Sequence, residues 1–141
     1  MRDWIDLIAR ILLAGVFIYE AVDSIIFFHD VQEAMTIYGL TWKQDLLLGG
    51  AIVLLSIGGI LFLLGYRVGL AGVLVLMYWL PVTFIVYSFW NDPPHEVRLN
   101  AIIFAKNLAI AGGVLLLMIR GSGRISIKRI ERVTRIPKGE T

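Results

Sequence analysis

Hydrophobic residues are grouped along the chain into four long stretches that are separated by short polar segments. The stretches cover residues 8–28, 46–65, 68–90 and 101–119. Each is close to the roughly 20 residues that an α-helix needs to cross about 30 Å of hydrocarbon. Helices satisfy their own backbone hydrogen bonds, as lipid requires. The pattern therefore predicts an all-α membrane protein, a bundle of four transmembrane helices over residues 1–120.

The segments between the stretches predict how the bundle is oriented and completed. Basic residues gather near both ends of the chain and at the turn before residue 68, whereas the loops 30–45 and 91–96 are mainly acidic. The positive-inside rule then places both termini in the cytoplasm. In the first outer loop, apolar residues recur at helical spacing up to Gly39, which favours a short helix at the membrane surface.

The tail over residues 121–141 is basic. After a glycine-rich break, apolar residues alternate with cations, an arrangement that suits anionic lipid of the inner leaflet. The simpler interpretation is a basic anchor that fixes topology without a specific partner. Nucleic-acid binding is not expected, because the patch is small and tethered to a membrane. The cations assigned to lipid headgroups are Lys128, Arg129, Arg132 and Arg135.

Composition excludes several kinds of chemistry. The chain has no cysteine, which removes disulfide exchange and thiolate ligands. Its two histidines, His29 and His95, belong to no ligand motif, so neither a metal site nor intrinsic haem is expected. Two acids, Asp3 and Asp6, stand where a signal peptide has its basic region, so the first stretch is expected to remain as a transmembrane helix.

Ionisable residues inside the apolar stretches form the first candidate site. A charge in hydrocarbon is costly and persists where it is paired, faces other helices or does chemistry. Counted from the outer ends, the acids and the lysine fall at similar depth, so we predict an ion pair between the first and last helices. The pair could be a structural salt bridge, or one carboxyl could exchange a proton. The cluster consists of Glu20, Asp23, Lys106 and Asn107.

Two further sets of residues lie on single helix faces. Small residues recur every four positions in the last stretch, a ridge that allows another helix to approach closely; they are Ala101, Ala105, Ala109 and Gly113. Around Pro81 of the third stretch, four residues form a stripe that could line a flat ligand such as a quinone. Helix packing plus an interfacial aromatic belt explains the same stripe. Its members are Trp79, Thr83, Tyr87 and Trp90.

Several segments resemble the DoxX family of small bacterial membrane proteins. They are Arg10–Phe17 (RILLAGVF), Tyr38–Leu40 (YGL), Leu80–Thr83 (LPVT), Phe89-Trp90 and Phe104–Ala109 (FAKNLA). The resemblance implies four helices with both ends in the cytoplasm, and an association with redox complexes of the bacterial inner membrane. The chain departs from a frequent family pattern: near the end of the first helix, where a basic residue is common, it has the acids Glu20 and Asp23.

Three functions are therefore compared. The first is a non-catalytic accessory subunit that docks onto a quinone-linked oxidoreductase or respiratory complex, with lipid and other membrane subunits as partners. The second is a quinone-binding redox subunit that uses the Glu20, Asp23 and Lys106 cluster for proton exchange, with quinone as its cofactor. The third, a small-solute permease, is disfavoured because the inner halves of the helices lack the ionisable side chains that a polar route across the membrane needs.

Overall fold

The computed structural model describes residues 2–121, so the basic tail predicted for residues 121–141 lies outside the described residues from residue 122 onward. Within the described part the chain is entirely helical. Its elements are α1 (Arg2–Ile26), α2 (Phe28–Ile37), α3 (Gln44–Leu64), α4 (Val68–Val86), the short 3-10 helix η1 (Phe89–Asn91) and α5 (Pro94–Arg120). The expectation of an all-α membrane fold is confirmed.

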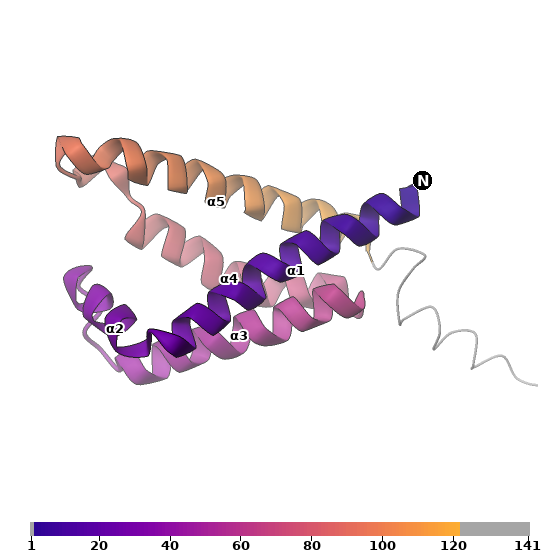
Figure 1. Ribbon diagram of the computed structural model, residues 1–141, viewed down its shortest axis with the longest axis horizontal. Helices are drawn as coiled ribbons and strands as arrows, with labels where there is room; N and C mark the ends of the chain where they lie inside the picture. Colours follow the sequence, from indigo (N-terminus) through magenta and orange to yellow (C-terminus); the bar gives the residue numbers. More distant parts are fainter. Residues whose placement is uncertain (1, 122–141) are drawn as a thin grey trace, which may run out of the picture.

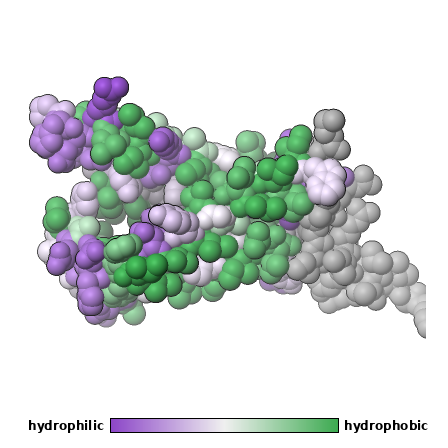
Figure 2. All heavy atoms as spheres, in the orientation of Figure 1, coloured by the Kyte–Doolittle hydropathy of each residue, from purple (hydrophilic) through white to green (hydrophobic). Residues whose placement is uncertain are grey.

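Three of the helices, α3, α4 and α5, are each long and apolar enough to cross a membrane. The helices α1 and α2 together form a fourth candidate span, bent by 92° at the break between them. Figure 2 shows hydrophobic residues over the middle of the face in view and hydrophilic residues gathered at the end that carries α2 and the start of α5. A bundle of this kind, with an apolar middle and a polar end, suits a bilayer.

The short helix expected after the first span is confirmed as α2. It begins immediately after Phe27 and ends before Gly39, whose φ of +78° is accessible to glycine at little cost. Side chains at the start of α3 hold α2 in place. The Gln44 amide donates to the Thr36 hydroxyl and to the Leu40 carbonyl, each at 2.8 Å, and Gln32 donates to Asp45.

The last helix is longer than its hydrophobic stretch predicts. It begins at Pro94, a residue type that suits the first helical position because it lacks an N–H that would have no partner there. Polar residues over 95–100 interrupt the apolar pattern and therefore concealed this first part of α5 from a reading based on hydropathy. The side chain of Asn100 donates to Asp92 at 2.7 Å and ties the helix to the preceding loop.

Glycines allow the spans to approach one another closely. A Cβ at Gly58 of α3 would lie 2.5 Å from the Val75 side chain of α4, and one at Gly59 would lie 2.9 Å from Ile18 of α1. Gly72 of α4 has the same role toward Met118 of α5. Packing at these points is too close for any other residue without a shift of the neighbour.

The start of α1 and the end of α5 lie together at one end of the bundle. The Arg120 guanidinium at the end of α5 pairs with the Asp6 carboxylate of α1 at 2.7 Å. Close by in sequence, the Arg10 side chain is only 1% exposed, and its Nε donates to the Asp6 carbonyl. From this end α5 diverges from α1, so that the two helices are well separated where α2 lies (Figure 1).

Candidate functional site

A cavity of about 760 Å³ lies beneath α2 and is referred to below as the α2 cavity. Its walls come from the second half of α1, the inner side of α2, the first half of α3 and the second half of α4. This volume falls within the range of roughly 300–1,000 Å³ that is usual for small-molecule sites. The 92° bend between α1 and α2 creates the cavity, because it places α2 across the ends of the other helices.

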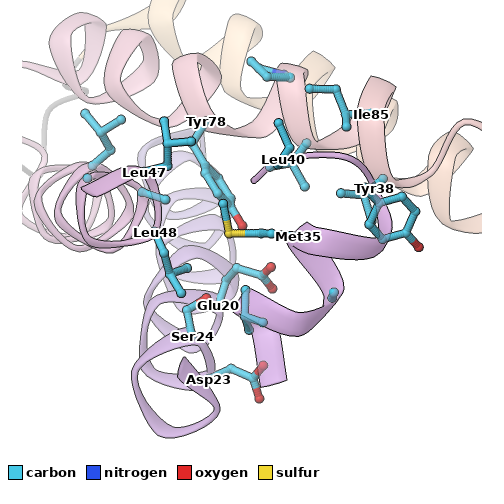
Figure 3. A pocket seen from close by; sticks show the side chains of 18 of the residues that line it. Glu20, Asp23, Ser24, Met35, Tyr38, Leu40, Leu47, Leu48, Tyr78 and Ile85 are labelled. Atoms are coloured by element: carbon cyan, nitrogen blue, oxygen red, sulfur yellow. The ribbon is translucent and has the colours of Figure 1, made fainter. Parts of the chain in front are cut away.

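Two acids of the predicted cluster line the α2 cavity. Glu20 and Asp23 lie three residues apart on α1, and both are half-buried. The Tyr78 hydroxyl of α4 lies next to the Glu20 carboxylate and is placed to donate a hydrogen bond to it. Figure 3 shows Tyr78 from α4 and Met35 from α2 directed toward Glu20. The two acids singled out in the sequence thus lie together in the lining of one cavity, and Tyr78 is a neighbour of Glu20 that the sequence analysis missed.

The lysine of the predicted cluster lies elsewhere. Lys106 is exposed on α5, and no ion pair joins it to Glu20 or Asp23 in the part of the chain that the structure describes. The divergence of α5 from α1 explains the separation, because similar depth brings two residues together only where their helices touch. Asn107 contributes its backbone carbonyl, which accepts a hydrogen bond from the Trp79 indole at 3.1 Å.

The four residues of the stripe predicted around Pro81 do not surround one cavity. Trp79 and Thr83 are buried, and the Thr83 hydroxyl donates to the Trp79 carbonyl at 2.7 Å. Trp90 is exposed and packs beside Phe89 and Phe104. Only Tyr87 lines the α2 cavity. This face of α4 is turned toward the bundle core and α5, so the cavity uses the neighbouring face instead.

The predicted ridge of small residues divides between two environments. A Cβ at Gly113 would lie 3.6 Å from the Leu13 side chain of α1, and Ala101 is half-buried. Ala105 and Ala109 are exposed on the outer side of α5, close in sequence to Lys106. The buried contacts of α5 are made by Ala111, Val114 and Leu117. The first half of α5 therefore presents small residues and a cation away from the bundle.

Among residues 2–121, no group of three or more histidine, aspartate and glutamate side chains is arranged to hold a metal ion.

The fold and the cavity show that the chain belongs to the class of small helical integral membrane proteins. The family model described as DoxX matches residues 5–88. The chain is 33% identical over 128 residues to inner membrane protein YphA of Escherichia coli (strain K12), covering 91% of each chain. It is 31% identical over 124 residues to inner membrane protein YqjF of the same organism, covering 88% of this chain and 89% of the relative. The protein belongs to the DoxX family. No solved structure matches the chain.

Proposed function

We propose that the protein is an accessory subunit that docks through α5 onto a quinone-linked oxidoreductase or respiratory complex of the bacterial inner membrane. In this proposal both termini lie in the cytoplasm, as the distribution of basic residues indicates. The redox nature of the partner follows from the family resemblance. The proposal does not require catalysis by this chain.

The observation that carries the proposal is the exposed Lys106 in the apolar part of α5. The nearest charged residues along the helix are Arg98 and Arg120, so Lys106 is the one charged residue within the apolar stretch 101–119. A cation at such depth is costly in lipid and is expected to meet an acid or to be covered by protein. The exposed Ala105 and Ala109 beside it leave room for the backbone of a second helix.

Several features agree with an accessory role. The inner half of the bundle is filled by the apolar side chains of Phe17, Phe62 and Val114, each 0% exposed. This core offers no polar route across the membrane, which disfavours a permease. Trp79 and Thr83 are used for packing, so a redox subunit with a quinone at that stripe gains no support.

The experiment compares wild-type protein with Lys106→Met after gentle solubilisation of native membranes. Wild type is expected to co-purify with subunits of a redox complex in a fixed ratio. Loss of the Lys106 charge removes the contact with the partner's acid, so we expect the recovered partner to fall at least about tenfold, equivalent to ~1.4 kcal/mol. Quantitative mass spectrometry of the eluate measures the ratio.

Lys43→Met is the matched control, because it makes the same change at an exposed residue before α3. This variant should retain the partner. Unchanged partner recovery with Lys106→Met, or equal loss with both variants, would contradict docking through α5.

A further inference from the structure

The α2 cavity carries an excess of negative groups. Glu20, Asp23 and Asp30 line it, and no lysine, arginine or histidine is among the described residues that do so. An ionised carboxylate accepts hydrogen bonds but donates none. Removed from water, such a group needs a compensating positive charge or a proton. Lys106, the cation that the sequence predicted as the partner of these acids, does not line the cavity.

Four aromatic side chains line the cavity together with the acids. Phe27, Tyr38, Tyr78 and Tyr87 line the same cavity. The face of an aromatic ring attracts a cation, and the attraction grows when water is excluded. Tyr78 also holds its hydroxyl beside Glu20, which fixes the position of the carboxylate.

The remaining walls are apolar. Met35 of α2, Leu47 and Leu54 of α3, and Val82 of α4 are among the residues that line the cavity. Pro81 of the same wall has no N–H, so the Met77 carbonyl loses its usual helical donor. Apolar walls, aromatic rings and acceptors without a basic residue match a molecule that is hydrophobic around a positive centre.

We propose that the α2 cavity binds a hydrophobic organic cation, with Glu20 and Asp23 as its counter-charges and the aromatic side chains around its apolar groups. A quinone fits this lining less well, because it carries no positive charge and would leave the carboxylates without a counter-charge, whereas a cation supplies one. The inference concerns a different face of the bundle from the docking surface on α5, so either proposal can fail without the other.

Binding is tested with the purified full-length chain in mild detergent, by equilibrium dialysis of radiolabelled tetraphenylphosphonium. Triphenylphosphine oxide serves as a neutral probe with similar aromatic groups, and a short-chain ubiquinone serves as the competing ligand class. Tetraphenylphosphonium should bind saturably and at least about tenfold more tightly than the neutral probe, and the quinone should not displace it. Equal binding of both probes, or displacement by the quinone, would overturn the inference.

Variants locate the site. Glu20→Gln and Asp23→Asn should each weaken tetraphenylphosphonium binding by about tenfold or more, the factor that corresponds to ~1.4 kcal/mol. Glu33→Gln removes the same charge from an exposed position of α2 that does not line the cavity, and it should bind as wild type does. Equal weakening by Glu33→Gln would show a general surface attraction and would reject the site.

A second pair of variants fills space instead of changing charge. A Cβ at Gly50 or at Gly49 meets no atom within 4 Å, so both positions accept a larger side chain. Gly50 lines the cavity and Gly49 does not. Gly50→Leu should therefore reduce binding at least about fivefold, ~1 kcal/mol, while Gly49→Leu leaves it unchanged. The same affinity in both variants would place the ligand elsewhere.

Discussion

Replacing Gly58 with leucine is expected to prevent recovery of a folded, monodisperse protein. A Cβ at this position would lie 2.5 Å from Val75 Cγ2 and 3.3 Å from the Ala71 carbonyl oxygen. Val75 and Ala71 are each 0% exposed, so neither can move aside without shifting α4. Overpacking of this kind costs about 1–3 kcal/mol and sometimes more. Size-exclusion chromatography and the thermal unfolding midpoint in detergent measure the effect.

Gly49→Leu is the matched control for this change. It lies on the same helix, and a Cβ there meets no atom within 4 Å. The control should elute and unfold as wild type does. If Gly58→Leu were as stable as Gly49→Leu, the close contact between α3 and α4 would be refuted.

Truncation of Phe17 is the second change with a large expected effect. Its ring is 0% exposed and joins three helices, with ring centroids 5.3 Å from Trp79 and 6.1 Å from Phe62. Phe17→Ala leaves a void at this junction. Such a change costs about 3 kcal/mol or more in soluble proteins. In a membrane the loss comes from van der Waals contacts, because lipid is as apolar as the core.

The expected result for Phe17→Ala is a clear fall of the thermal unfolding midpoint, measured in the same detergent. Leu12→Ala on the same helix removes a side chain that is 66% exposed and should change the midpoint little. Similar midpoints for the two variants would show that the described core does not determine stability.

The sequence was sufficient to predict the main helices and α2. Transmembrane length and apolar composition define the spans, and the spacing of apolar residues before Gly39 indicates the short helix. The start of α5 could not be found in this way, because polar and charged residues interrupt the apolar pattern over 95–100 although this segment is helical. Hydropathy reports where lipid can lie, and it does not report where a helix begins.

The candidate site was predicted only in part, for a geometrical reason. Glu20 and Asp23 stood out because charge is rare in apolar stretches. The sequence carries no signal for the 92° bend that places α2 over them, or for the face of α4 that brings Tyr78 beside Glu20. Depth along two helices suggested a partnership with Lys106, yet the divergence of α5 from α1 separates the residues (Figure 1).

Site-specific photocrosslinking in native membranes tests most directly whether the first half of α5 is a docking surface. A p-benzoylphenylalanine residue at the exposed Ala109 of α5 should yield one discrete protein adduct that contains a subunit of a redox complex. The same residue at Ile57 of α3, which is 46% exposed, should yield no such adduct. Absence of a protein adduct from position 109, or the same adduct from both positions, would contradict the account.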